Sequence, residues 1–150
     1  MLKRLYPSQP IVGVGAVMVC NGKILLEKRK AEPGRGKWSI PGGLVELGED
    51  IEKTVIREVK EETNLEAEKP KLIDVVDNIN ADKNGKIKYH FVIVIFSVTS
   101  SDDPTDARAQ DDAAELKWIP FYQVESYNLT KSFREFFKRN QVKLKRIKSF

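Results

Sequence analysis

Cysteine and histidine are almost absent from this sequence of 150 residues. The single cysteine, Cys20, has no partner for an internal disulfide, so a reducing, cytoplasmic location is expected. Cys20 stands at the end of an apolar run beside a turn, which is typical of a small packed residue rather than a reactive thiol. The single histidine, His90, excludes a metal site built from several histidines.

Long hydrophobic runs are also missing. The longest apolar stretch, residues 91–96, is far shorter than the about 20 residues that cross a bilayer. The basic start of the sequence is not followed by the apolar segment of a secretory signal. With 41% hydrophobic and 32% charged residues, the composition indicates a soluble globular protein, and residues 1–150 suit one domain. We therefore expect no membrane partner.

The net charge of +4 is distributed unevenly along the chain. Residues 138–150 form a basic C-terminal tail, whereas residues 46–68 are rich in acidic side chains. A basic tail can contact nucleic acid, but no aromatic residue alternates with the charges of residues 138–148, as it would in a groove for single strands. We interpret the tail as the solvated end of a helix, and nucleic acid is not expected as a partner.

The predicted fold class is α/β, with more strands than helices. Asn21-Gly22 and Asn84-Gly85 are typical of hairpin turns between antiparallel strands. Because hairpins connect most strands, a doubly wound parallel sheet is excluded, and a mixed sheet with helices on its two faces is expected. Sharp breaks are expected at residues 32–36 and 41–43. The predicted strands are runs of apolar and β-branched residues at 11–19, 23–29, 38–40, 72–79, 88–99 and 116–119.

Two helices are predicted. The first begins after Asp50, a suitable N-cap, and ends at Asn64, which tolerates the left-handed conformation of a helix C-terminus. The second begins at Thr130 and carries phenylalanines at helical spacing, a pattern that predicts an amphipathic helix packed on the core. A polar loop without apolar periodicity, residues 100–112, precedes the last strand.

Three glutamates of the first helix lie on one of its faces. Glu58, Glu61 and Glu62 are spaced i, i+3 and i+4, so their carboxylates are neighbours. Like charges at this spacing disfavour a helix by about 0.2–0.5 kcal/mol per pair. A hard divalent cation offsets that repulsion, and Mg²⁺ accepts a few carboxylates together with waters and substrate phosphates. The alternative is a solvated, glutamate-rich surface helix.

The surrounding stretch, residues 43–65, resembles the Nudix box, written G-x5-E-x7-R-E-U-x-E-E-x-G-U with U an apolar residue. The residues at the required offsets are Gly43, Glu49, Arg57, Glu58, Val59, Glu61, Glu62 and Leu65. Six fixed matches of this kind arise by chance about once in a million windows or less. One position departs: Asn64 stands where the family has glycine, and asparagine is the next most tolerant residue for positive φ.

The similarity extends to both sides of the box. Residues 13–16, 25–29 and 36–43 resemble the usual approach to it, and residues 113–120 resemble the late strand that carries a tryptophan. The resemblance covers roughly residues 10–130. It implies the fold of the family, an α/β/α sandwich around a mixed β-sheet.

The resemblance also implies an activity: hydrolysis of the pyrophosphate bond of a nucleoside diphosphate derivative, with Mg²⁺ as cofactor and Mn²⁺ as a substitute. The implied metal ligands are Glu58, Glu61, Glu62 and the backbone carbonyl of Gly42. Catalytic roles fall on Arg57, Glu58 and Glu62, with Gly43 and Glu49 as supporting residues. Which carboxylate acts as general base stays open.

Some family members take a further ligand or the base from an acidic residue in the late loop. The candidates are Asp111, Asp112 and Glu115, of which Asp112 is slightly favoured. Each of these acids, taken singly, is better explained as a solvated side chain than as a catalytic one.

Substrate contacts are predicted at three positions. Arg29 is a candidate phosphate contact, and Trp38 or Phe91 is a candidate base-stacking residue. Packing in the core or on the surface is the alternative for all three.

Among Nudix groups the sequence looks most like the ADP-ribose pyrophosphatases, although residues 78–88 lack the proline that often marks that group. The predicted products are then AMP and ribose 5-phosphate. Three alternatives stay open: a pyrophosphohydrolase that converts an (oxidised) NTP to NMP and pyrophosphate, an RNA 5′-end pyrophosphohydrolase, and a catalytically silent nucleotide- or RNA-binding module. A homodimer also stays open.

Overall fold

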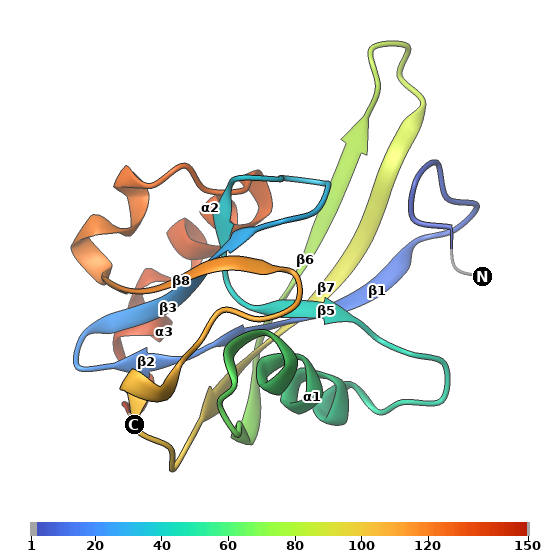
Figure 1. Ribbon diagram of the computed structural model, residues 1–150. Helices are drawn as coiled ribbons and strands as arrows, with labels where there is room; N and C mark the ends of the chain where they lie inside the picture. Colours follow the sequence, from blue (N-terminus) through green and yellow to red (C-terminus); the bar gives the residue numbers. More distant parts are fainter. Residues whose placement is uncertain (1–2, 150) are drawn as a thin grey trace.

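Two four-stranded sheets form the centre of the fold in the computed structural model, which describes residues 3–149 (Figure 1). The strands are β1 (Ile11–Val17), β2 (Val19–Cys20), β3 (Lys23–Arg29), β4 (Trp38–Ser39), β5 (Gly42–Leu44), β6 (Glu68–Ala81), β7 (Ile87–Thr99) and β8 (Ala113–Pro120). The first sheet has the order β5-β1-β7-β6 and is mixed, because β1 runs parallel to β7 and antiparallel to β5. In the second sheet β3 pairs antiparallel with β2, β4 and β8. The predicted mixed sheet is confirmed, and a second sheet accompanies it.

The predicted first strand divides between the two sheets. β1 ends at Val17, and the chain passes through Met18 into β2 of the second sheet. Asn21 and Gly22 then have φ values of 50° and 75°, as a two-residue hairpin turn requires, which confirms that prediction. The break predicted at residues 41–43 is wrong in part, because Gly42 pairs with Gly15 at the start of β5.

The first predicted helix is present with the predicted ends, whereas the region of the second predicted helix contains two helices. They are α1 (Ile51–Thr63), α2 (Lys131–Arg139) and α3 (Gln141–Lys145), with the short 3-10 helices η1 (Pro104–Asp106) and η2 (Phe121–Ser126). Asp50 is the extended residue before α1, and Asn64 ends α1 with a φ of 70°. Thr130 caps α2, its Oγ1 accepting from Phe133 N–H at 3.3 Å. One late helix was predicted, whereas the structure has two.

Asn140 explains the break between α2 and α3. Its buried side chain donates to Asp74 Oδ2 at 2.8 Å and to the Phe136 carbonyl at 3.0 Å. Arg139 also pairs with Asp74 at 2.8 Å. The interpretation of the tail as a solvated helix end is therefore wrong in part, because this region docks on β6 and buries Leu144. Phe150, the last residue of the predicted tail, lies outside the described residues.

Helices cover opposite faces of the sheets, as the sandwich prediction requires (Figure 1). α1 buries Val55 and Val59 completely against Val14 and Phe96 of the first sheet. Burial of such a side chain contributes about 1.5–3 kcal/mol. The phenylalanines of α2 belong to a separate core, to which both sheets contribute. Within residues 3–149, no helix is long and apolar enough to cross a membrane.

Candidate functional site

Two glycines of β5 let the glutamates of α1 approach the sheet. A Cβ atom on Gly42 would collide with the Val14 carbonyl, and one on Gly43 would collide with the Glu58 carboxylate. Gly42 N–H donates a hydrogen bond to Glu62 Oε1 at 2.8 Å. The absence of side chains at these two positions therefore sets the distance between β5 and the acidic face of α1.

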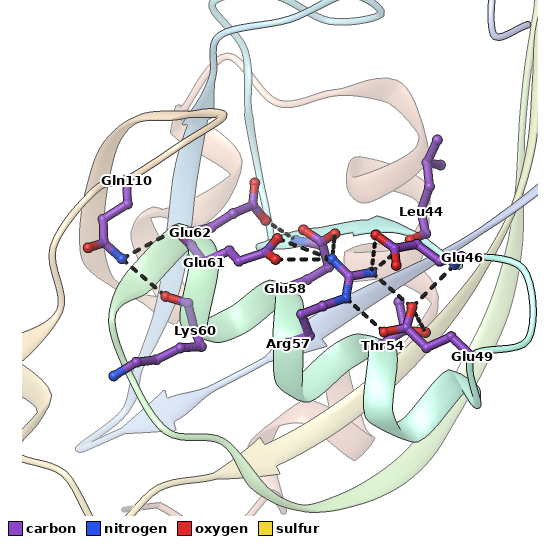
Figure 2. Close-up of polar contacts among 11 residues, drawn as sticks. Leu44, Glu46, Glu49, Thr54, Arg57, Glu58, Lys60, Glu61, Glu62 and Gln110 are labelled. Atoms are coloured by element: carbon purple, nitrogen blue, oxygen red, sulfur yellow. Dashed lines mark hydrogen bonds and ion pairs between the residues drawn. The ribbon is translucent and has the colours of Figure 1, made fainter. Parts of the chain in front are cut away.

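Arg57 connects the carboxylates of the site (Figure 2). Its Nε and Nη2 donate to the two oxygens of Glu49 at 2.7 and 2.9 Å. Its Nη1 donates to Glu58 Oε1 at 2.8 Å and to Glu61 Oε2 at 3.1 Å. A further bond from Nη2 to the Leu44 carbonyl, 3.2 Å long, ties this network to the end of β5. Arg57 thus contacts two of the three glutamates that are predicted to bind the metal.

The surroundings of these carboxylates shift their pKa values in opposite directions. The guanidinium of Arg57 lowers the pKa of Glu49 to about 2, and the Thr54 hydroxyl adds a 2.8 Å hydrogen bond to the same carboxylate. Burial raises the pKa of Glu58 above its ordinary value, although Arg57 opposes the shift. Glu49 therefore stays ionised beside Arg57, while Glu58 is held in a less polar environment closer to β5.

Glu27 and Glu62 form a buried carboxyl pair behind these residues. Their exposed fractions are 1% and 3%, and the two carboxyl groups lie close enough to shift each other's pKa. Burial raises the pKa of both groups, and the neighbouring charge of Glu27 raises that of Glu62 further. Among the described side chains, Glu27 Oε2 is the one buried polar atom without a hydrogen-bond partner. A cation at this point would relieve an arrangement that is otherwise costly.

Within residues 3–149, no group of three or more Asp, Glu, His or Cys side chains is arranged so that it could hold a metal ion. The contacts give the reason. Arg57 draws Glu58 and Glu61 toward its guanidinium, whereas Glu62 faces the Gly42 amide and Glu27. The predicted donor set still fits Mg²⁺, because it consists of oxygen atoms, and beside it Glu27 Oε2 is buried without a hydrogen-bond partner. The metal assignment therefore stays a prediction, with one oxygen of Glu58 accepting from Arg57.

A cleft of about 940 Å³ opens beside this cluster. It brings together most of the predicted site residues: Arg29, Gly42, Gly43, Glu49, Glu58, Glu62, Phe91 and Asp112. Arg57 lies behind the wall, where it holds the carboxylates. Glu61 is not part of the lining, and its side chain is 43% exposed, against 14% for Glu58.

Trp38 does not line the cleft. Its side chain is 7% exposed and packs edge-on against Tyr127, with ring centroids 5.5 Å apart. Its ring belongs to the core that also contains the α2 phenylalanines. Trp38 is therefore a core residue, which was the alternative to the predicted base-stacking role. Arg29 does reach the cleft, where its Nε donates to the Pro33 carbonyl at 2.8 Å.

The late loop is fixed to the C-terminal end of α1. Gln110 Nε2 donates to the carbonyls of Lys60 and Glu61 at 3.1 and 3.2 Å (Figure 2). This contact holds the loop beside the acidic cluster. Asp112 lines the cleft, and its charge contributes to the raised pKa of Glu58. Asp111 is not in the lining. Of the three late acids, Asp112 is thus the one that the fold places at the site, and Glu115 lies outside the lining as well.

Sequence reasoning missed Glu27, Gln110 and Arg4. Glu27 had a readable signal, because it stands two residues after Leu25 in a strand and so shares the inward face of that leucine. Gln110 and Arg4 had none, since both lie in segments without periodicity and reach the site by tertiary contacts.

Comparison with known proteins agrees with this geometry. The family model described as "NUDIX domain" matches residues 9–139. The ADP-ribose pyrophosphatase of Methanocaldococcus jannaschii is 36% identical over 116 residues, which are 77% of this chain. The match covers 64% of that protein, so the chain spans less than two thirds of its length.

Solved structures match over most of the chain. A MutT NUDIX hydrolase from Burkholderia pseudomallei has a TM-score of 0.69 and 31% identity, covering 94% of this chain and 100% of that one. The NUDIX domain of Shewanella oneidensis NrtR, crystallised with ADP ribose, has a TM-score of 0.74 and 24% identity, covering 91% and 90%. The second likeness shows the fold alone. The family model, which matches most of the chain, and the glutamate-rich helix beside the cleft lead to one conclusion: the chain belongs to the NUDIX domain family.

Proposed function

We propose that this protein hydrolyses the pyrophosphate bond of a nucleoside diphosphate derivative, and that ADP-ribose is the substrate, giving AMP and ribose 5-phosphate. The observation that carries the proposal is the meeting of Glu58, Glu62 and Asp112 in one cleft beside the β5 glycines. The identity to the ADP-ribose pyrophosphatase of Methanocaldococcus jannaschii supports the choice of substrate. A cytoplasmic location agrees with the unpaired, buried Cys20.

The carboxylates of Glu58, Glu61 and Glu62, with the Gly42 carbonyl, would hold Mg²⁺, and Mn²⁺ would substitute for it. When bound, the ion neutralises phosphate oxygens and makes a coordinated water more acidic. Arg57 orients Glu58 through its 2.8 Å contact, and Glu49 fixes the Arg57 side chain from the opposite side. Glu58 and Glu62 would thus form an anionic wall of the cleft for the cation and the diphosphate, and Glu61 lies outside the lining.

The remaining chemistry falls to residues that line the cleft. A carboxylate among Glu58, Glu62 and Asp112 accepts the proton of the attacking water. Arg29, a cation beside the cleft, binds an oxygen of the substrate phosphates. Phe91 forms an apolar wall for the nucleoside. These roles need no rearrangement of the sheets, because each side chain already reaches the cleft.

A substrate panel with Mg²⁺ tests the proposal. ADP-ribose, oxidised and ordinary NTPs, and RNA with a 5′-triphosphate are each incubated with the protein, and the products are separated by chromatography. We expect AMP and ribose 5-phosphate from ADP-ribose, no reaction in EDTA, and a loss of at least about 100-fold for Glu62→Gln. Release of inorganic pyrophosphate from NTPs as the main reaction would contradict the proposed substrate.

A further inference from the structure

The N-terminal segment before β1 is fastened to the β6–β7 hairpin. Tyr6 N–H donates to the Lys88 carbonyl at 2.8 Å, and the Tyr6 hydroxyl donates to Asp82 Oδ2 at 2.8 Å. The Lys86 ammonium lies 4.9 Å from the centre of the Tyr6 ring. The hairpin extends beyond the rest of the fold, and the blue segment that precedes β1 lies on the side of β7 (Figure 1). These contacts fix the backbone of the segment that carries Arg4.

Arg4 is placed over an aromatic ring inside the cleft. Its guanidinium carbon lies 5.7 Å from the centre of the Phe91 ring, and both residues line the cleft. Within residues 3–149, Arg4 forms no ion pair, although the cleft also holds several carboxylates. Of the described lining residues, Arg4 and Arg29 are the two with a positive charge, and they come from different segments of the chain.

The register of β1 shows how far Phe91, over which Arg4 lies, is from the acidic cluster. Ile11 pairs with Phe91 at the start of β1, whereas Gly15 pairs with Gly42 beside Glu62. Four residues separate these two points along β1, which is about 13 Å, and β7 and β5 lie on opposite sides of β1, so the direct separation is about 16 Å. A ribose and a base extending from a diphosphate at the acidic cluster cover a span of this kind.

The chemistry at the Arg4 end suits a base rather than a second phosphate. The Phe91 ring is 5% exposed and lies under the Arg4 guanidinium, so the planar guanidinium is the surface on which a flat heterocycle can stack. Asn78 lines the same end and accepts from Asn80 Nδ2 at 3.0 Å through its Oδ1, so its own Nδ2 is left as a donor. Ile93 adds an apolar wall. A phosphate site would instead call for several donors around one point.

We propose that Arg4, Phe91 and Asn78 form the nucleobase-binding end of the cleft, and that Arg4 is a specificity-determining residue. The inference rests on the proposed function, since it takes the acidic cluster as the diphosphate site. The base stacks on the Arg4–Phe91 pair, and the Asn78 amide donates to a ring nitrogen or oxygen. The N-terminal segment thereby acts as part of the substrate site.

Calorimetric titration with AMP and with ribose 5-phosphate tests this inference on wild type, Arg4→Ala, Phe91→Ala and Lys3→Ala. Lys3→Ala is the matched control, because the exposed Lys3 loses the same charge one residue away without lining the cleft. We expect AMP affinity to fall about tenfold in Arg4→Ala and in Phe91→Ala, and to stay within twofold in Lys3→Ala. Ribose 5-phosphate affinity should not change in any variant.

Kinetics with ADP-ribose give a second readout. Because the base lies far from the reacting phosphorus, Arg4→Ala should raise KM about tenfold and leave kcat within about threefold. Unchanged AMP binding in Arg4→Ala, or an equal loss for ribose 5-phosphate, would overturn the inference, as would AMP binding too weak to detect in wild type. Arg4-dependent AMP binding without hydrolysis of any nucleotide would support the base site and reject the proposed function. Hydrolysis of ADP-ribose with wild-type KM in Arg4→Ala would support the proposed function and reject the base site.

Discussion

Glu27→Gln is expected to stabilise the metal-free protein at pH 8. Glu27 and Glu62 are both almost fully buried and face each other, and burial raises the pKa of each. Below the unfolded-state pKa of about 4.3 both groups are neutral whether the chain is folded or not, so stability is complete. As the pH rises, the unfolded chain ionises freely and the folded one does not. Stability is therefore lost as the pH rises toward the folded-state pKa values.

Glutamine removes one of the two titrating groups and keeps the shape of the side chain. Each unit by which the fold raises the pKa costs about 1.4 kcal/mol once the pH exceeds that pKa. Recovering one such unit at pH 8 raises Tm by about 3–6 °C in a chain of this size, at roughly 2–4 °C per kcal/mol. The amide of the new glutamine can also donate to Glu62, which lets the Glu62 carboxylate ionise.

Thermal unfolding in EDTA, followed by circular dichroism at pH 5 and pH 8, measures the effect. Glu115→Gln is the matched control, because Glu115 is exposed on β8 and should leave Tm unchanged within about 1 °C. We expect the Tm of Glu27→Gln to rise at pH 8, and to rise less at pH 5, where only part of the cost is present. A lower Tm at pH 8, or the same rise at pH 5, would refute the assignment of a strained carboxyl pair.

Three further outcomes are expected. Gly43→Ala should lower turnover at least about tenfold, because its Cβ would occupy the position of the Glu58 carboxylate. Trp38→Ala should cost about 3–5 kcal/mol in urea unfolding and leave the KM of the folded protein unchanged, since Trp38 packs in the core. Mg²⁺ should raise Tm more at pH 8 than at pH 5, because protons compete with the ion for Glu58 and Glu62; an equal shift at both pH values would place the ion elsewhere.

Local signals in the sequence predicted the helix that carries the site. Asp50 and Asn64 mark its ends because capping depends on the conformation of single residues, which nearby chemistry determines. The spacing of Glu58, Glu61 and Glu62 then fixes their common face. The hairpin at Asn21-Gly22 was predictable for the same reason, since both residues adopt positive φ.

Features set by distant parts of the chain were not predictable in this way. The break between α2 and α3 depends on Asn140 reaching Asp74, which is 66 residues away in the sequence. Glu27 faces Glu62 only after the second sheet has packed beside α1. Arg57 is bonded to Glu58 and Glu61, so the carboxylates predicted to share a metal are turned toward a guanidinium instead. The sequence predicts that the glutamates of the first helix share one face, but the partners that each carboxylate contacts are determined by the fold.

The rate of AMP formation from ADP-ribose, measured against Mg²⁺ concentration for wild type and Glu62→Gln, tests the central claim most directly. The account predicts saturable activation of wild type by Mg²⁺ and a rate at least about 100-fold lower for the variant at every concentration. Equal rates in the two proteins, or a wild-type rate that does not depend on Mg²⁺, would contradict it.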